Sequence, residues 1–270
     1  MEIRGKVVVV TGAARGIGAA LARRFAAEGA AGIVVSDLDG DDAVRVAAEL
    51  SNDTTRVIGA TTDVSVEADV QDLVRLVEAE LGPIDVFCSN AGMATGLGLG
   101  APDEWWAAAW QVNLLAHVYA ARAVVPGMVE RGGGYLLQTA SAAGLLIQPG
   151  DAPYSVTKHA AVSFAEWLSL TYGDQGIKVS VVCPQGVRTD LLMTGLEAGL
   201  PAARAVALAG KLLEPEDVAD AVVEGMADER FLILPHPEVA EFIRRKADDP
   251  GRWLAGMRRL VSMLDANQPT

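Results

Sequence analysis

The stretch Thr11-Gly12-Ala13-Ala14-Arg15-Gly16-Ile17-Gly18 follows the short β-branched run 6–11 and opens a segment with helical periodicity. Ile17, Leu21 and Phe25 recur there at four-residue steps. Glycine permits a sharp turn and a close approach of the backbone to a ligand, and a helix N-terminus offers free N–H groups to a phosphate. The stretch therefore predicts the first β-α unit of a dinucleotide-binding fold. A tight turn that only requires small residues is the alternative interpretation.

Outward from this stretch, strand and helix patterns alternate along the chain. Further strands are expected at 32–37, 56–61, 84–89, 135–139, 178–182 and 231–234, and helices at 41–50, 66–81, 102–112, 113–131, 153–172 and 215–227. This alternation predicts an α/β fold with a parallel, doubly wound sheet and right-handed crossovers. A TIM barrel shares the alternation but does not call for a glycine-rich turn after its first strand. We interpret residues 1–270 as a single domain.

Composition and charge narrow the possible functions. Of the 270 residues, 51% are apolar, and 35 acidic against 22 basic residues give a net charge of −13. Such a surface repels phosphate backbones and anionic lipid, so we expect neither nucleic acid nor membrane as a partner. The two cysteines follow apolar runs and are expected in the core, and three scattered histidines predict no metal site. Without a signal-peptide pattern or an apolar stretch of about 18 residues, a cytoplasmic location is expected.

Asp37 ends the second expected strand, 19 residues after the last glycine of the turn. A carboxylate there can bind both hydroxyls of an adenosine ribose and repels a 2′-phosphate, and Leu38 beside it offers no base. This favours NAD over NADP, although Arg15 in the glycine turn is a contrary sign because a cation could reach a 2′-phosphate. Asp63 and Val64, after the third strand, could contact adenine. A loop aspartate that resembles an N-cap is an equally good interpretation of Asp63.

Tyr154 and Lys158 lie four residues apart on an expected helix, so they share one face. Ser141 follows an expected strand, at the sheet edge where ligands bind in open α/β folds. The ordinary tyrosine pKa of about 10 is too high for a base at neutral pH, but a nearby ammonium and an oxidised nicotinamide favour the phenolate. We therefore predict that Tyr154 exchanges a proton with an alcohol or ketone and that Ser141 holds the reacting oxygen. Lys158 would lower the tyrosine pKa and bind the nicotinamide ribose.

In order and spacing, these motifs resemble the short-chain dehydrogenase/reductase family in its single-domain form. The matching segments are Thr11-Gly12 through Gly18, Asp63-Val64, Asn90-Ala91-Gly92, Asn113, Ser141, Tyr154 with Lys158, and Pro184-Gln185-Gly186 with Thr189. The resemblance implies a Rossmann-type sheet of about seven parallel strands with helices on both faces, and hydride transfer with NAD(P)(H). It also implies a homotetramer or homodimer built through the helices at 113–131 and 153–172.

The resemblance further implies roles for the residues at matching positions. The expected cofactor contacts are Gly12, Arg15, Gly16, Ile17, Gly18, Asp37, Leu38, Asp63, Val64, Asn90, Ala91, Gly92, Tyr154, Lys158, Pro184, Gly186, Val187 and Thr189. The expected catalytic set is Asn113, Ser141, Tyr154 and Lys158. Asn113 would hold a water that links the lysine to solvent, and a helix N-cap is its plainer role. Ser89 and Gln185 depart from the family pattern, where asparagine and glycine are usual.

Substrate specificity is expected in the least regular segments. The expected substrate contacts are Ser141, Leu145, Gln148, Tyr154 and Leu191. Residues 190–212 are interpreted as a mobile lid whose apolar side chains predict a hydrophobic secondary alcohol or ketone, or simply pack the lid on the body. Residues 236–270 form a basic helical extension, which we interpret as packing on the body or on a partner subunit. Our hypothesis is that this extension covers a neighbouring subunit or its substrate cleft.

The leading hypothesis is an NAD-dependent alcohol dehydrogenase or ketone reductase. An NADPH-dependent reductase of ketones or 3-ketoacyl thioesters is the alternative within enzymes, and Asp37 argues against it. A regulator or scaffold that senses the cofactor is the alternative outside enzymes. The intact catalytic set argues against a sensor, which has no evident need for all four side chains.

Overall fold

Seven parallel strands form the centre of the computed structural model, which describes residues 1–266. Their order is β3-β2-β1-β4-β5-β6-β7, and each neighbouring pair is parallel. The strands are β1 (Val7–Thr11), β2 (Gly32–Asp37), β3 (Arg56–Thr61), β4 (Val86–Ser89), β5 (Gly134–Thr139), β6 (Ile177–Val182) and β7 (Leu232–Ile233). The predicted Rossmann-type sheet is confirmed, and the TIM barrel is excluded because β3 and β7 are open edges.

The sequence of β1 explains why this strand lies at the centre of the sheet. All five of its residues are buried. Val8 and Val10 pack into the core on one face, whereas Val7 and Val9 pack into the core on the other. A continuous β-branched run suits a parallel strand that is covered on both sides.

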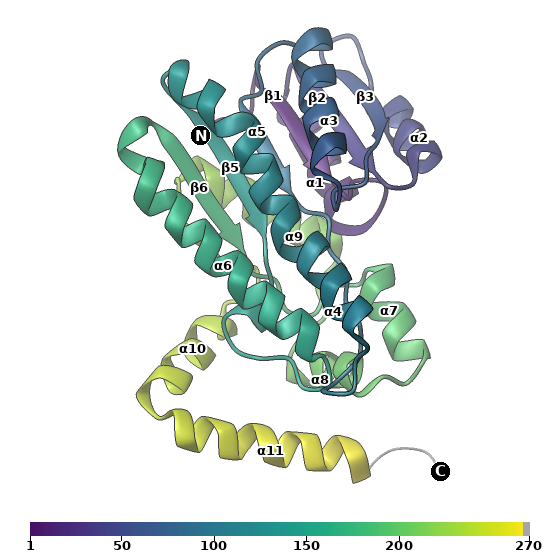
Figure 1. Cartoon of the computed structure of the whole chain (residues 1–270), viewed down its shortest axis with the longest axis vertical. Coiled ribbons are helices and arrows are strands. Elements are labelled where there is room, and N and C mark those ends of the chain that lie inside the picture. The colour runs from purple at the N-terminus through teal and green to yellow at the C-terminus, as the bar shows by residue number, and fades with distance from the viewer. Residues whose placement is uncertain (267–270) are drawn as a thin grey trace.

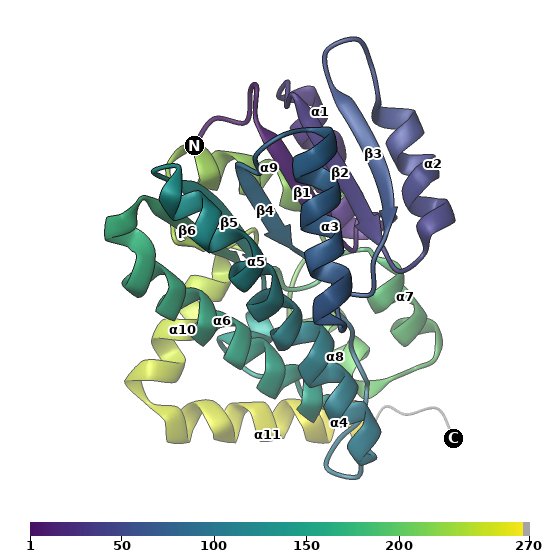
Figure 2. The ribbon, with the colours of Figure 1, turned by 45° about the horizontal axis from the view of Figure 1, so that its top comes forward.

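Helices cover both faces of the sheet (Figure 1; Figure 2). One layer consists of α1 (Gly16–Ala27), α2 (Gly40–Leu50) and α9 (Pro215–Ala227), and the other of α3 (Glu67–Glu80), α5 (Ala116–Glu130) and α6 (Ala152–Tyr172). In α1, Leu21 and Phe25 are fully buried, as their four-residue spacing predicts. The two layers leave the carboxyl ends of the strands uncovered, and the site is built there.

The chain order reverses between β1 and β4, which lie side by side at the middle of the sheet. From β1 the chain moves to β2 on one side, and from β4 it moves to β5 on the other. The connections therefore leave in opposite directions, and a crevice opens beyond the carboxyl ends of these strands.

The helices expected at 102–112 and 113–131 form one continuous helix. It consists of α4 (Asp103–Trp110), a π-helical turn at Gln111–Leu115 and α5. Asn113 thus lies inside this continuous helix and does not cap it, which corrects its plainer interpretation. By length and composition Asp103–Glu130 could cross a membrane, but half of its most apolar window is buried in the molecule. It is a buried core helix.

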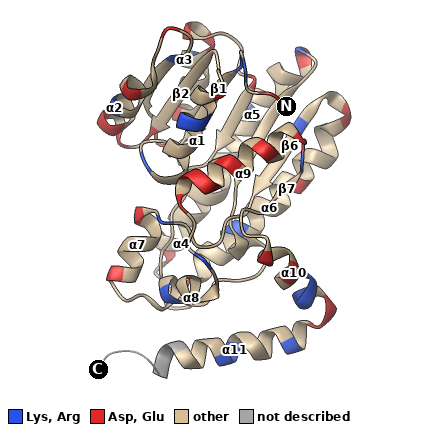
Figure 3. Ribbon diagram, turned by 180° about the vertical axis from the view of Figure 1, so that it is seen from behind, with Lys and Arg blue, Asp and Glu red and all other residues tan. Residues whose placement is uncertain are grey.

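Segment 190–212, expected as a loose lid, contains two helices, α7 (Asp190–Glu197) and α8 (Pro201–Ala209). A bridge between Val187 and Leu213 joins its two ends. The extension forms α10 (Glu238–Asp248) and α11 (Pro250–Ala266), and residues 267–270 lie outside the described part. α11 packs against α8 and α10. Its charged side chains are mainly basic, whereas those of α9 are acidic (Figure 3).

Candidate active site

The β1–α1 turn lies against the end of β4. Gly12 and Gly16 have φ angles of +62° and +54°, a region that glycine adopts freely. A Cβ on Gly12 would lie 2.7 Å from the Cα of Ala91, so the turn has no room for a side chain there. Arg15 is the N-cap residue of α1, and its side chain makes no capping hydrogen bond. The first turn of α1 is therefore suited to receive an anion.

Asn90 joins this turn to two strand ends. Its Nδ2 donates to the backbone oxygens of Thr11 at 2.9 Å and Gly12 at 3.1 Å, and its Oδ1 accepts from Thr139 Oγ1 at 3.2 Å. The backbone N–H groups of Asn90 and Ala91 donate to Thr11 Oγ1 at 3.0 and 3.2 Å. These bonds fix the floor of the crevice across β1, β4 and β5.

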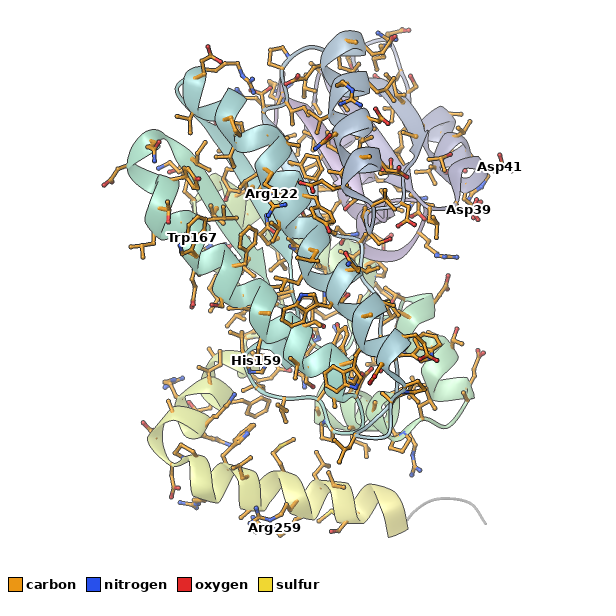
Figure 4. All side chains as sticks on the ribbon, viewed as in Figure 1. Asp39, Asp41, Arg122, His159, Trp167 and Arg259 are labelled. Atoms are coloured by element: carbon orange, nitrogen blue, oxygen red, sulfur yellow. The ribbon has the colours of Figure 1, made fainter. Side chains whose placement is uncertain are left out.

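Asp37 lies at one end of the crevice, at the carboxyl end of β2. Its Oδ2 accepts from the backbone N–H of Ala14 at 3.0 Å, and its Oδ1 accepts from that of Asp39 at 3.2 Å. Figure 4 shows Asp39 and Asp41 close by, at the start of α2. Arg15 Nε lies 4.0 Å from Asp190 Oδ2 on α7, and both side chains are exposed. The carboxylates around this end make it negative.

Asp63 forms part of the wall after β3. Its Oδ1 accepts from the backbone N–H of Ser65 at 2.9 Å and from Ser65 Oγ at 2.6 Å. This turn holds the aspartate beside Val64, and both residues line the crevice. Asp63 can therefore stabilise its own turn and also contact a ligand in the crevice.

Ser141, Tyr154 and Lys158 meet beyond the carboxyl end of β5. Tyr154 is hydrogen-bonded to Ser141. The backbone N–H of Ala143 donates to Ser141 Oγ at 3.1 Å, which fixes the serine hydroxyl at the start of its loop. Lys158 Nζ donates to the backbone oxygen of Thr139 at 2.9 Å and lies 5.8 Å from the centre of the Tyr154 ring. The helical spacing thus places both side chains on the face of α6 that meets β5.

Burial controls the protonation of these two groups. Burial raises the pKa of Tyr154 to about 12, and the hydrogen bond with Ser141 only partly opposes this rise. We expected a lowered tyrosine pKa, so the direction in this structure is opposite to the prediction. Burial lowers the pKa of Lys158 to about 8. At neutral pH the tyrosine is therefore a phenol that can donate a proton.

Asn113 supports the site from the π-helical turn. Its Oδ1 accepts from the backbone N–H of Met93 at 2.9 Å, and its Nδ2 donates to Met93 O at 2.9 Å and to Thr157 Oγ1 at 3.1 Å. Gly92 lies between this amide and Lys158, because a Cβ there would be 3.3 Å from Asn113 Oδ1 and 3.2 Å from Lys158 Nζ. π-Helical turns inside α-helices are frequent at functional sites.

Most of the predicted site residues line one cavity of about 880 Å³, within the range of small-molecule sites. They are Gly12, Arg15, Gly16, Ile17, Gly18, Asp37, Leu38, Asp63, Val64, Asn90, Ala91, Gly92, Ser141, Gln148, Tyr154, Lys158, Pro184, Val187, Thr189 and Leu191. The cavity therefore extends from the end of β2, past the glycine turn, to the catalytic side chains and α7.

Three predicted residues are not part of this lining in the described chain: Asn113, Leu145 and Gly186. Asn113 is fully buried behind Gly92. The side chain of Leu145 packs into the core, and its carbonyl accepts a hydrogen bond from Lys246, so its role as a substrate contact is not supported. Gly186 faces Leu212 and Val206 of the segment behind it, and its carbonyl accepts from the backbone N–H of Leu213.

The residues present suit a nicotinamide dinucleotide. The turn at Gly12 excludes a side chain, the N-terminus of α1 faces the cavity, and a carboxylate ends β2. A bound dinucleotide would be held along these elements and would bring hydride chemistry to the cavity beside Tyr154. Among the described residues, no group of three or more His, Cys, Asp or Glu side chains could hold a metal ion.

Sequence reasoning missed Asp151, which also lines the cavity. Its carboxylate accepts from the backbone N–H groups of Thr95, Gly96 and Tyr154 at 2.8, 2.7 and 3.1 Å, and from Thr95 Oγ1 at 2.7 Å. It therefore caps α6 and anchors the loop after β4 to the catalytic helix. Its place as an acidic residue three positions before Tyr154 was the available signal.

Sequence reasoning also missed His117, a fully buried residue hydrogen-bonded to Gln138. Burial and the nearby charge of Lys158 lower its pKa to about 3. The imidazole therefore stays neutral beside the lysine. A single histidine on an apolar helix gave no signal from which this contact could be predicted.

Comparison with known proteins agrees with this architecture. The sequence profile described as short chain dehydrogenase matches residues 6–198. A 1-deoxy-11-beta-hydroxypentalenate dehydrogenase of Streptomyces exfoliatus is 37% identical over 259 residues, which cover 94% of this chain and 92% of the relative. A short chain dehydrogenase/reductase from Burkholderia phymatum, solved in complex with NAD, superposes with a TM-score of 0.84 at 30% identity and covers 92% of this chain and 95% of its own.

A second solved structure has a different nucleotide. L-sorbose reductase from Gluconobacter frateurii, complexed with NADPH and L-sorbose, superposes with a TM-score of 0.78 at 29% identity, over 87% of this chain and 97% of its own. The matched sequence and the shared fold identify one family, whose members oxidise CH–OH groups with NAD(P) as acceptor. This chain belongs to the short-chain dehydrogenase/reductase family of NAD(P)-dependent oxidoreductases.

Proposed function

We propose that this protein transfers hydride between NAD(H) and an apolar secondary alcohol or ketone. The observation that carries the proposal is the meeting of Ser141, Tyr154 and Lys158 in the cavity that begins at the glycine turn. In ketone reduction, Tyr154 donates its phenolic proton to the carbonyl oxygen while Ser141 donates a hydrogen bond to the same oxygen. A bound nicotinamide would supply the hydride to the carbonyl carbon.

In alcohol oxidation the same groups act in reverse. The phenol must first lose its proton, and a positive charge near the ring favours that loss. Lys158 supplies one such charge 5.8 Å from the ring centre, and its bond to Thr139 O holds the ammonium in place. Asn113 acts on this machinery as a positioning residue, since it holds the loop at Met93 and the catalytic helix at Thr157.

NAD is the proposed cofactor. The carboxylate of Asp37 is fixed at the ribose end of the crevice, and Asp39 adds a second negative charge beside it. Arg15, which would favour a 2′-phosphate, is drawn towards Asp190. NADP is the alternative, and it gains support from the L-sorbose reductase solved with NADPH.

An apolar substrate is proposed because segment 190–212 presents apolar side chains to the cavity beside the catalytic residues: Leu191, Leu192, Leu200 and Val206. Gln148 is a polar group at the same end. Segment 190–212 is proposed to act as a lid, hinged where Val187 and Leu213 pair. The Streptomyces relative is named as a dehydrogenase of a hydroxypentalenate.

A cytoplasmic homotetramer or homodimer is the proposed state of the protein. The outer face of α6 exposes Val156, Trp167 and Leu170, with exposed fractions of 46%, 51% and 86%. Trp167 and Arg122 lie on the outer side of the α5–α6 layer in Figure 4. Exposed apolar side chains of this kind on α6 suit contact with a second copy of the chain.

Titration with NADH and NADPH, followed by nicotinamide fluorescence, tests the cofactor. Tighter NADH binding is expected, and tighter NADPH binding would contradict the role of Asp37. Tyr154→Phe tests the chemistry, because it should abolish turnover while the affinity for NADH stays within twofold. Turnover that survives this substitution would contradict the role of Tyr154 as the proton donor.

A further inference from the structure

A second cavity, of about 260 Å³, lies under the C-terminal extension. Its walls come from the loop after Ser141, from α8 and from the two helices of the extension, and include Leu146, Val206, Phe242, Trp253, Met257 and Leu260. Ser141, Gln148 and Gln185 belong to this lining and also to the lining of the catalytic cavity. The second cavity, here called the apolar compartment, therefore adjoins the catalytic serine.

Lys246, on the C-terminal extension, connects the extension to the loop that follows Ser141. Lys246 Nζ on α10 donates to the backbone oxygens of Leu145 and Leu146 at 2.8 and 2.7 Å. Burial lowers the pKa of this lysine. These carbonyls follow the short helical turn after Ser141, so a charged donor satisfies groups that the turn leaves free. The extension is thus fixed to the loop that holds the catalytic serine.

The walls of the apolar compartment come from both sides of the point where the match to the family profile ends. That match ends at residue 198, whereas α8, α10 and α11 all follow it. The rings of Phe242 and Trp253 are tilted by 44° to each other, and their centres lie 6.2 Å apart. On α11, Met257 and Leu260 line the compartment, while Arg259 lies on the outer side of the helix in Figure 4. The compartment therefore combines the loop after the catalytic serine with helices that follow the matched part of the chain.

Trp253 adds a polar group to these walls. Its indole nitrogen is buried and has no hydrogen-bond partner among the described residues. Buried donors are nearly always paired, because an unpaired one costs the desolvation of the group. An oxygen on a bound molecule would supply the missing acceptor. No basic side chain belongs to the described lining, so a neutral oxygen fits better than a carboxylate.

We propose that the apolar compartment binds the hydrocarbon part of the substrate, and that Trp253 donates a hydrogen bond to a neutral oxygen at its far end. This inference rests on the proposed reaction at Ser141 and Tyr154, because it assumes that the substrate oxygen lies there. The substrate class is then a secondary alcohol or ketone with an extended apolar group that carries a hydroxyl or carbonyl oxygen.

The experiment uses the full chain with 2-butanone, 2-hexanone and 2-octanone, and it measures kcat/KM from the consumption of NADH. In the wild type, kcat/KM should rise about fourfold for each added methylene until the compartment is full. Ala205→Leu adds bulk at a buried position of the lining, and it should flatten the rise beyond 2-hexanone to less than twofold in total. Ala207→Leu is the matched control on α8, outside both linings, and should keep the wild-type rise.

Binding separates this inference from the proposed reaction. The affinities of the same ketones for Tyr154→Phe saturated with NADH are measured by calorimetry. Affinity that grows with chain length supports the compartment even if the wild type reduces none of the ketones, which would overturn the reaction alone. Turnover without chain-length dependence, or an equal rise in the Ala205→Leu variant, would overturn the compartment alone.

Trp253→Phe tests the hydrogen bond, since it keeps an aromatic ring and removes the N–H group. The wild type should prefer 8-hydroxy-2-octanone over 2-octanone in kcat/KM, and the variant should lose about fivefold of that preference. Its kcat/KM for 2-octanone should stay within twofold. An unchanged preference in the variant would overturn the assignment to Trp253.

Discussion

The carboxylate of Asp37 accepts a hydrogen bond from the backbone N–H of Ala14 at 3.0 Å, which joins the carboxyl end of β2 to the glycine-rich turn. Its other oxygen accepts from the backbone N–H of Asp39 at 3.2 Å. The group proposed to select the cofactor is therefore fixed by the same turn that would receive the phosphates. If the proposed cofactor site is right, one short stretch of backbone couples recognition of the ribose to recognition of the pyrophosphate.

Asp37→Ser should change the cofactor preference. The variant loses a charged acceptor for the ribose hydroxyls and a charge that repels a 2′-phosphate, so NADH affinity should fall about tenfold and NADPH affinity should rise. Both affinities are measured by fluorescence titration. Asp41→Ser is the control, because it removes an equal charge farther along α2 (Figure 4). Equal changes in the two variants would show that only overall charge matters.

The sheet was predictable because each of its main strands carries a local pattern. The β-branched run of β1 and the helical stripe of α1 stand next to each other in the sequence, and both are buried as the patterns require. The continuous helix around Asn113 was not predictable in the same way. A π-helical turn depends on tertiary contacts, here the bonds from Asn113 to Met93 and Thr157, and leaves no periodic signal.

Some residues of the site could likewise be predicted from the sequence, and others could not. Motif residues such as Tyr154 and Lys158 could be placed because helical spacing fixes which of them share a face. Leu145 does not line the cavity, because the direction of a loop side chain depends on what packs beside it, and here Lys246, 101 residues later, binds its carbonyl. The raised pKa of Tyr154 likewise follows from burial, which the sequence does not give.

Asp151→Ala should lower both stability and activity. The substitution removes the cap of α6 and the anchor of the loop at Thr95 and Gly96, and a loss of about 2–4 kcal/mol in the free energy of unfolding is expected. Urea unfolding and kcat/KM are measured together. Asp151→Ser keeps a capping oxygen and should recover about half of the lost stability. Equal losses in the two variants would contradict a capping role.

Lys158 should make stability depend on pH. Burial lowers its pKa from 10.5 to about 8, so between these values the folded state binds fewer protons than the unfolded state and the free energy of unfolding rises with pH. The cost of burying the ammonium is fully present below pH 8. The raised pKa of Tyr154 opposes this trend only above pH 10, where the unfolded phenol ionises.

Lys158→Met removes that cost at every pH. The free energy of unfolding of the variant minus that of the wild type should therefore fall by about 3 kcal/mol between pH 7.5 and pH 10.5. Urea unfolding at several pH values measures this difference. Lys211→Met, at an exposed position, is the control for the loss of a lysine charge, and an equal fall in that variant would contradict the role of burial. A flat difference for Lys158→Met would mean that the lysine is not buried as an ammonium.

Asp190→Asn should release Arg15 towards a 2′-phosphate. The two side chains lie 4.0 Å apart and are exposed, and such a pair contributes at most about 1 kcal/mol, so NADPH affinity should rise up to about fivefold while NADH affinity stays unchanged. Titration with both nucleotides measures the effect, which should weaken at high salt because exposed charges are screened. The gain should disappear when Arg15→Ala is added. A gain that persists in this double variant, or one of equal size for NADH, would show that Arg15 does not oppose Asp37 in choosing the cofactor.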